Sequence, residues 1–317
     1  HARVVTEPKD QTNVASKESY GLSEYAACCL DQVEAGKHSA QKERLMMPLV
    51  TVFTPTYNRA DCLHLCYESL MRQTCKDFLW LIIDDGSSDG TQMLVREWIA
   101  KTHDFEIRYV YKENGGLHTG YNAAIERLDT ELAVCVDSDD YMPDDAIEII
   151  CDVWKRNNDG KVAGIAALDM DTQGKIIGDL LPQQHTINLI DLLAGKYKIV
   201  NGDRKLVIRS DLYKSVAPQM TFPGEKNFNP HYMHLQISQT HDFLVLNKVL
   251  CIVEYRADGM SSGMYRQYYN SPQSFAQTRR LYLSFPNTGL SFRFRNCVHY
   301  VSSSILARDK GFVRTSP

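Results

Sequence analysis

The sequence predicts an α/β protein with a mainly parallel sheet that is covered by helices on both faces. Short apolar, β-branched runs alternate with segments whose apolar residues recur at helical spacing. Clusters of polar and acidic residues follow several of these runs directly. Strands that alternate with helices in this way need crossover connections, and crossovers produce parallel pairing.

Four strands are expected in the first half of the chain, with a helix after each of the first three. The strands are expected at 49–54, 79–83, 107–111 and 132–136. Pro55 is expected to end the first strand. The helices are indicated by apolar stripes at 63–70, 94–99 and 117–128, and Asp89 is a natural N-cap for the second. Two later strands, at 205–209 and 250–255, are expected to complete or flank the sheet.

Composition places the chain among soluble globular proteins. It has 317 residues, of which 44% are hydrophobic and 23% charged, so disordered and collagen-like classes are excluded. No apolar run approaches the roughly 18 residues that a membrane span needs. The nine cysteines are scattered, which favours reduced, mostly buried thiols. The first residues show no signal-peptide pattern, so we expect a cytoplasmic protein.

The charge is unevenly distributed. The segment 261–317 contains eight basic residues and the single acid Asp309, a net charge of +7, so the rest of the chain carries −11. Aromatic residues lie between these basic residues. Such a tail suits an anionic surface, such as membrane headgroups, a pyrophosphate-linked acceptor or a polyanion. The alternative is a packed helical cap with solvated arginines. Nucleic acid is not expected as a partner, because the main body is acidic and has no recognition motif.

Three carboxylates lie within four residues directly after the fourth strand, at Asp137-Ser138-Asp139-Asp140. Like charges this close repel one another unless a cation lies among them, and hard oxygen ligands suit Mg²⁺ or Mn²⁺ shared with substrate phosphates. The alternative is a helix N-cap, with Pro143 in the first helical turn. Open sheets of this type bind ligands beyond the carboxyl ends of their strands.

Two other strand ends carry polar turns that point to the same crevice. Asp84-Asp85, followed by a glycine turn, suits hydrogen bonding to a base and ribose. The turn Asn114-Gly115-Gly116 allows close approach of the backbone to a ligand. His118 is a candidate for contact with phosphate or sugar, with local capping as the alternative, and Asn122 lies one helical turn beyond it.

Four segments resemble family 2 glycosyltransferases of the GT-A fold. They are PLVTVFTPTYNRADCL, LIIDDGSSDGT, ENGGLHTGYNAAI and CVDSDDYMPDD, and together they lie within residues 48–155. The similarity continues more loosely through Gly202-Asp203-Arg204, Gly224-Glu225-Lys226 and residues 253–261, which are similar to the bacterial capsule, exopolysaccharide and wall-polymer branch.

The resemblance implies roles for individual residues. Asp85 matches the aspartate that reads uracil, and Asp137-Ser138-Asp139 matches the DxD motif, in which Asp139, with Asp137, would hold Mn²⁺ or Mg²⁺. Glu225 matches the catalytic base, and Asp203 is the competing candidate. The expected substrate contacts are Pro55, Tyr57, Arg59, Asp85, Asn114, Gly115, Gly116, His118, Asn122, Asp137, Ser138 and Arg204.

The predicted protein is an inverting, metal-dependent glycosyltransferase that moves a sugar from a UDP-sugar to a hydroxyl of a glycan, polymer or lipid-linked acceptor. Residues 1–47 form an N-terminal extension with one amphipathic helix, 48–155 the donor-binding half, 156–260 the acceptor-binding half, and 261–317 the basic tail. The tail is expected to hold the enzyme at the inner face of a membrane or near its acceptor.

Two other functions use similar residues. A nucleotidyltransferase also needs paired aspartates and a divalent ion, but it requires a basic loop after the first strand, where this chain offers only Arg59. A non-catalytic module that binds sugar nucleotides or polysaccharides is the other alternative.

Overall fold

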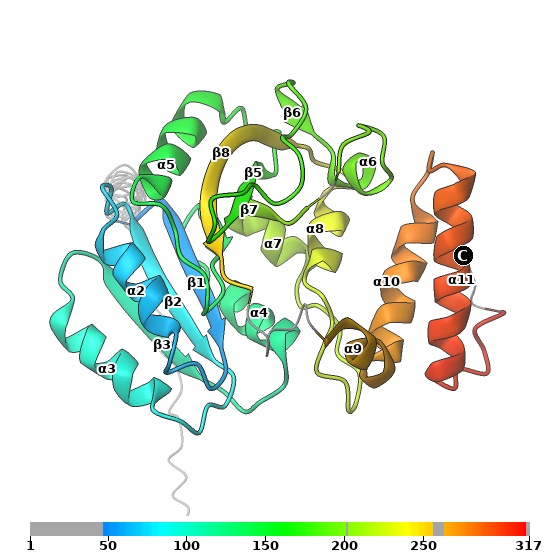
Figure 1. The fold of residues 1–317 in the computed structure, drawn as a ribbon, viewed down its shortest axis with the longest axis horizontal. Coiled ribbons are helices and arrows are strands. Elements are labelled where there is room, and N and C mark those ends of the chain that lie inside the picture. The colour runs from blue at the N-terminus through cyan, green and yellow to red at the C-terminus, as the bar shows by residue number, and fades with distance from the viewer. Residues whose placement is uncertain (1–46, 201, 256–262, 315–317) are drawn as a thin grey trace, which may run out of the picture. The chain divides into compact units, whose positions relative to one another are not determined.

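The computed structural model describes residues 47–200, 202–255 and 263–314 (Figure 1). The chain divides into two compact units, His1–Met47 and Pro48–Pro317, and the second contains all the elements described below. The amphipathic helix predicted near residues 22–33 lies outside the described residues.

The described strands form one sheet in the order β3-β2-β1-β4-β7-β5-β8-β6. Their bounds are β1 Val50–Thr56, β2 Phe78–Asp84, β3 Glu106–Tyr111, β4 Leu132–Cys135, β5 Gly164–Asp171, β6 Thr186–Ile187, β7 Arg204–Arg209 and β8 Phe243–Val253. The pairs β1–β2, β2–β3, β1–β4 and β5–β8 are parallel, whereas β7 runs antiparallel to both β4 and β5. The predicted mixed α/β fold with a mainly parallel sheet is confirmed.

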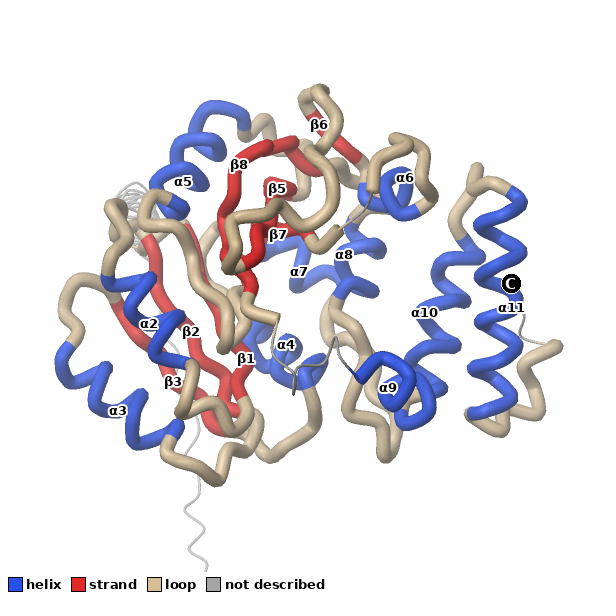
Figure 2. The backbone as a smooth tube through the Cα atoms, in the orientation of Figure 1, coloured by secondary structure: helices blue, strands red, loops and turns tan. Residues whose placement is uncertain are grey.

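Helices cover both faces of this sheet (Figures 1 and 2). Their bounds are α2 Leu63–Met71, α3 Thr91–Lys101, α4 Leu117–Glu126, α5 Ala146–Asn157, α6 Leu189–Leu193, α7 Ser210–Val216, α8 His231–Ile237, α9 Met264–Asn270, α10 Pro272–Ser284 and α11 Leu290–Leu306. Helices α2, α3 and α5 share one hydrophobic core with the sheet, and α4, α6, α7 and α8 share the other.

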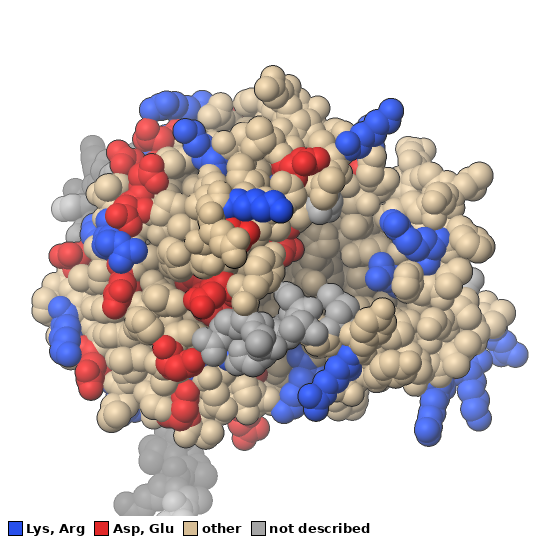
Figure 3. Space-filling view, in the orientation of Figure 1, with Lys and Arg blue, Asp and Glu red and all other residues tan. Residues whose placement is uncertain are grey.

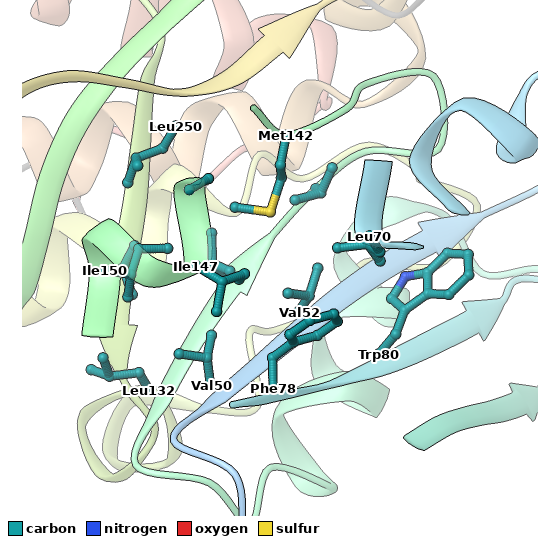
Figure 4. Packing of buried hydrophobic residues seen from close by; sticks show 14 of the residues in the cluster. Val50, Val52, Leu70, Phe78, Trp80, Leu132, Met142, Ile147, Ile150 and Leu250 are labelled. Carbon is teal, nitrogen blue, oxygen red and sulfur yellow. The ribbon is translucent and has the colours of Figure 1, made fainter. Parts of the chain in front are cut away.

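The two cores follow from the two-residue period of the strands. In β1, Val50 and Val52 point into the first core and Phe53 into the second. Figure 4 shows Ile147 and Ile150 of α5 above this first-core side of the sheet. Trp80, Trp98 and Trp154 also belong to this first core, and all three are buried.

The first four predicted strands are present, but Pro55 does not end the first. β1 continues through Pro55 to Thr56, and Pro55 pairs with Ile83 of β2. The backbone N–H and C=O groups of the odd-numbered residues in β1 point toward β4, as the hydrogen bond from Val136 N to Phe53 O shows. The β1–β4 ladder ends at Phe53. The missing N–H of Pro55 therefore falls where no ladder partner is needed.

The acidic run after β4 is not a helix N-cap. Helix α5 begins only at Ala146, and Asp145 occupies its N-cap position. The run instead forms a tight turn, in which Asp140 N donates to Asp137 O at 3.0 Å. That alternative interpretation of the acidic run is therefore wrong.

The basic tail is helical in its described part. Helices α10 and α11 pack side by side at one edge of the unit (Figure 1). Tyr282, Phe285, Phe292 and Tyr300 are buried, which matches the packed-cap interpretation for these aromatic residues. No helix in the described part of the chain combines the length and the apolar character that crossing a bilayer requires.

The packing of α5 on the sheet predicts a clear stability difference. Ile150 is fully buried in the first core, whereas Ile99 of α3 is exposed. Ile150→Ala should lower the free energy of unfolding by about 2–5 kcal/mol, because it leaves a cavity. The same change at Ile99 should cost no more than about 0.5 kcal/mol. Urea unfolding followed by circular dichroism measures both, and equal losses would contradict the packing.

Candidate active site

Strand direction brings the polar strand ends to one edge of the sheet. Parallel pairing places Thr56 of β1 opposite Asp84 of β2, and Phe53 opposite Cys135 of β4. Because β7 runs antiparallel to β4, its first residues lie at the same edge, with Asp203 just before them. The pair Leu168–Arg204 places the carboxyl end of β5 there as well.

The loops after β1 and β2 are bonded to each other. Asn58 N donates to Ser87 Oγ at 2.8 Å, and Ser88 N donates to Asn58 Oδ1 at 2.8 Å. The carboxylate of Asp89 accepts from Ala60 N at 3.1 Å and from Thr91 N at 3.0 Å, so it joins the start of α3 to the first loop. Tyr57 is half exposed on this rigid support.

Asp85 organises the glycine turn. Its carboxylate accepts from Gly115 N at 2.9 Å and Gly116 N at 2.7 Å, and it pairs with Lys112. Asn114 Nδ2 donates to the Asp85 backbone oxygen at 2.8 Å. These bonds connect two of the predicted substrate-contact segments. In this structure the Asp85 carboxylate is buried and engaged with the protein.

Gly116 is fixed by a close approach of the chain. It has a φ of +94°, and a Cβ there would lie 1.9 Å from Lys226 O. The segment around Glu225 and Lys226 therefore packs directly on the glycine turn, which no residue with a side chain would permit. Lys226 Nζ adds a bond to Asn114 Oδ1 at 2.5 Å.

The acidic turn presents two carboxylates and buries a third. Asp137 is exposed and Asp139 half-buried, while Ser138 and Asp140 are buried. Asp140 accepts from Glu254 N at 3.2 Å, which joins the turn to the end of β8. Burial, partly offset by the nearby Lys205, raises the pKa of Asp140 to about 8.

A buried ion pair underlies this turn and was missed in the sequence. Lys205 Nζ lies 4.0 Å from Asp169 Oδ1 and donates to Cys135 O, the last residue of β4, at 3.3 Å. Burial raises the pKa of Asp169 to about 6. Burial opposes the charge on Lys205, but the surrounding carboxylates, Asp169 foremost, raise its pKa. Asp169 directly follows an apolar run, as Asp137 does, and this position in the sequence could have indicated that it lies at the same edge of the sheet.

The acidic turn fits a hard divalent cation in part. Asp137 and Asp139 offer carboxylate oxygens, the ligands that Mg²⁺ and Mn²⁺ prefer. Within the described ranges, no three His, Cys, Asp or Glu side chains are grouped so that they would hold a metal ion alone. The donor set therefore suits an ion that takes its remaining ligands from a bound diphosphate and water.

Glu225 is bonded to the start of helix α10. Its carboxylate accepts from Gln273 N at 2.8 Å, from Ser274 N at 2.8 Å and from Ser274 Oγ at 2.6 Å. It therefore caps the N-terminus of α10 and is itself buried. A carboxylate held by three donors is poorly placed to accept a proton from a substrate.

Three other predicted contact residues are half-buried or buried. Asn122 exchanges two 2.8 Å bonds with the backbone of Gln219, so both ends of its amide are engaged. Arg204 donates to Asp179 O at 2.7 Å and Ile177 O at 3.2 Å. His118 is buried, and burial lowers its pKa. The substrate contacts of these three residues stay predictions, and the side chains of Asn122 and Arg204 are half-buried.

Helix α8 contributes a pair of half-buried histidines. The rings of His231 and His234 meet edge to face at 5.8 Å, and His234 Nε2 lies 3.0 Å from the Tyr213 hydroxyl. Burial lowers the pKa of His231 to about 4 and that of His234 to about 3, and the neighbouring His231 adds to the effect on His234. Both imidazoles are therefore neutral near pH 7.

Comparison with known proteins identifies the family of this site. The model of "Glycosyl transferase family 2" matches residues 51–213. Chondroitin synthase from Escherichia coli is 29% identical over 133 residues, which are 42% of this chain and 19% of that protein. Teichoic acid poly(glycerol phosphate) polymerase from Staphylococcus epidermidis is 32% identical over 120 residues, 38% of this chain and 16% of that protein. The matches thus span under a fifth of these relatives.

Solved structures share the fold. S. aureus TarS 1-349 in complex with UDP-GlcNAc has a TM-score of 0.58 at 18% identity, covering 83% of this chain and 74% of TarS 1-349. The mannosyltransferase PcManGT from Pyrobaculum calidifontis, in complex with GDP-Man and Mn²⁺, has a TM-score of 0.55 at 18% identity, with coverage of 82% and 74%. At this identity the likeness shows the GT-A arrangement of the sheet and helices.

The neutral histidines of α8 predict a loss of stability in acid. When the pKa of a group is lower in the folded than in the unfolded state, the unfolded state binds more protons as the pH falls. The free energy of unfolding is therefore at its full value above the unfolded-state pKa and decreases below it. For His231, the fall from pH 6.5 to pH 5 should lower the free energy of unfolding by about 2 kcal/mol. His231→Gln should remove this part of the pH dependence, whereas His103→Gln, at an exposed position, should leave it unchanged. Urea unfolding at both pH values measures it, and identical slopes for all three proteins would refute it.

Proposed function

This chain belongs to glycosyl transferase family 2, and from that premise we propose that it transfers a sugar from a UDP-sugar to a hydroxyl group of a polymer or lipid-linked glycan. The observation that carries the proposal is the acidic turn, with Asp137 exposed and Asp139 half-buried at the edge where the loops of β1 and β2 meet. Family membership favours transfer over the two alternatives, nucleotidyl transfer and simple binding.

The donor assignment is supported by the loops around Asp85. Asp85 holds the glycine turn and lies beside Thr56, whose backbone oxygen accepts from Asp85 N at 2.8 Å. Such a rigid frame of backbone groups suits a flat base and a ribose. TarS has been solved with UDP-GlcNAc and with UDP, which favours UDP as the nucleotide here.

The acceptor assignment rests on the relatives. A chondroitin synthase and a teichoic acid polymerase both build polymers, so a growing polymer end or its lipid-linked precursor is the proposed acceptor. The half 156–260 would hold it, with α8 as part of the wall. His231 and His234, neutral and half-buried there, suit hydrogen bonds to sugar hydroxyls.

The chain's own residues account for the proposed chemistry. Asp137 and Asp139 would hold a divalent ion, Mn²⁺ or Mg²⁺, which when bound stabilises negative charge on the departing diphosphate. Asp140, Lys205 and the main chain of β4 hold the turn in place. Attack by the acceptor hydroxyl opposite the leaving diphosphate would invert the configuration at the anomeric carbon.

The base is better supplied by Asp203 than by Glu225. Asp203 is exposed at the edge that carries the acidic turn, and no described residue donates a hydrogen bond to its carboxylate. Glu225 has three donors from α10. A general base needs an available lone pair within reach of the acceptor proton. We therefore propose Asp203 as the base and Glu225 as the residue that docks α10.

Removal of the proposed metal ligand should abolish turnover. Asp139→Asn should lower Mn²⁺-dependent UDP release from the preferred UDP-sugar by about 100-fold or more, because charge on the leaving group is no longer stabilised. Asp144→Asn is the matched control, since that exposed carboxylate pairs only with Arg72 on the surface. A panel of UDP-sugars with added acceptor measures the rates. Full turnover by Asp139→Asn in the presence of a chelator would refute the assignment.

Substitutions of Asp203 and Glu225 should have different effects on the reaction rate and on stability. Asp203→Asn should lower kcat by about 10²–10⁴-fold while UDP affinity and the unfolding temperature stay unchanged. Glu225→Gln should instead lower the free energy of unfolding by about 1–3 kcal/mol, because α10 loses its charged cap. Ser274→Ala removes one donor to the same carboxylate and should reproduce part of that loss. If Glu225→Gln abolishes kcat at unchanged stability, Glu225 is the base.

A further inference from the structure

Helix α11 exposes an apolar face that no described residue covers. Leu290, Phe294, Val298, Val301 and Ile305 recur every three or four residues, so they lie along one side of the helix. All five are exposed, Leu290 by 87% and Phe294 by 73%. We call these five residues the apolar stripe.

The opposite side of α11 is the packed side. Phe292, Asn296, Tyr300 and Ser303 are buried there. Arg279 of α10 donates to Asn296 Oδ1 at 3.0 Å, and this bond fixes the rotation of α11 about its axis. The apolar stripe is therefore held outward by specific contacts on the other face. Apolar residues would not face water in this order if the helix only capped the domain.

Four cations lie on α11 and directly after its C-terminal end. Arg295, Arg308, Lys310 and Arg314 are exposed on α11 and the turns that follow it. Asp309 is the only acid among the described residues from 263 to 314, and its carboxylate accepts from Gly311 N at 2.8 Å. In Figure 3 the charged side chains over the α10–α11 side are basic, whereas acidic and basic side chains are mixed over the strand side.

The apolar stripe and the nearby cations together favour one kind of binding partner over others. A second copy docked on the same face would bring two sets of arginines together, and like charges would oppose the contact. An acidic polymer would pair with the arginines but would gain nothing from Phe294 or Ile305. An anionic lipid surface satisfies both features, because its phosphates bind the cations and its acyl boundary takes up the apolar side chains.

We propose that α11 lies flat on an anionic membrane, with the apolar stripe in the headgroup–acyl boundary and Arg295, Arg308, Lys310 and Arg314 at the lipid phosphates. The helix has 17 residues and is about 25 Å long, which suits a helix in the plane of the interface. This inference does not depend on the reaction catalysed. It would keep the active-site edge near lipid-linked substrates.

The test is co-sedimentation of the full chain with vesicles. The probes are phosphatidylcholine alone and phosphatidylcholine with about one third phosphatidylglycerol. We expect binding to the anionic vesicles, weaker binding at high salt, and little binding to the neutral ones. The double variant Phe294→Ser with Ile305→Ser should reduce the partition coefficient about tenfold or more, because two large apolar side chains leave the boundary.

A matched double variant controls for surface hydrophobicity. Met93→Ser with Leu180→Ser removes two exposed apolar side chains outside the tail and should bind vesicles as the unchanged protein does. Thermal unfolding checks that both double variants fold. Equal vesicle binding by the stripe variant and the unchanged protein would overturn the proposal. So would a dimer that the stripe substitutions dissociate, or binding to polyphosphate without binding to vesicles.

Discussion

The parallel pairing of β1 with β2 and β4 is the constraint on which the site depends. It places the carboxyl ends of three strands side by side, and the antiparallel β7 adds its first residues to the same edge. Acidic residues stand at the ends of β2 and β4, and Asp203 directly precedes β7. The fold that assembles the site therefore also concentrates negative charge, and that charge has to be compensated within the protein or by a ligand.

The protein compensates several of its buried acids with its own groups. Lys112 pairs with Asp85, and Lys205 lies beside Asp169 and below the acidic turn. Glu225 accepts hydrogen bonds from the N-terminus of α10, where the helix dipole favours a carboxylate. Asp137 and Asp139 stay nearer the surface, where a cation with a diphosphate can complete the balance.

The sequence patterns predicted those features of the fold that depend on residues close together in the chain. The strands and helices from β1 to β4 follow from apolar periodicity, and the acidic turn follows from its place after a buried strand. The partners of polar side chains that lie far away in the sequence were not predicted. Asn122 meets Gln219, and Glu225 meets Ser274, across long separations that periodicity does not encode. Pro55 in a central strand was missed because its tolerance depends on where β4 stops.

We propose that the acidic turn binds a cation together with the donor diphosphate. The most direct measurement is calorimetric titration of UDP into the protein with and without Mn²⁺. We expect Mn²⁺ to strengthen UDP binding about tenfold or more, because the diphosphate supplies oxygen ligands to the ion and the ion supplies positive charge to the diphosphate. The same UDP affinity in Mn²⁺ and in chelator would contradict it.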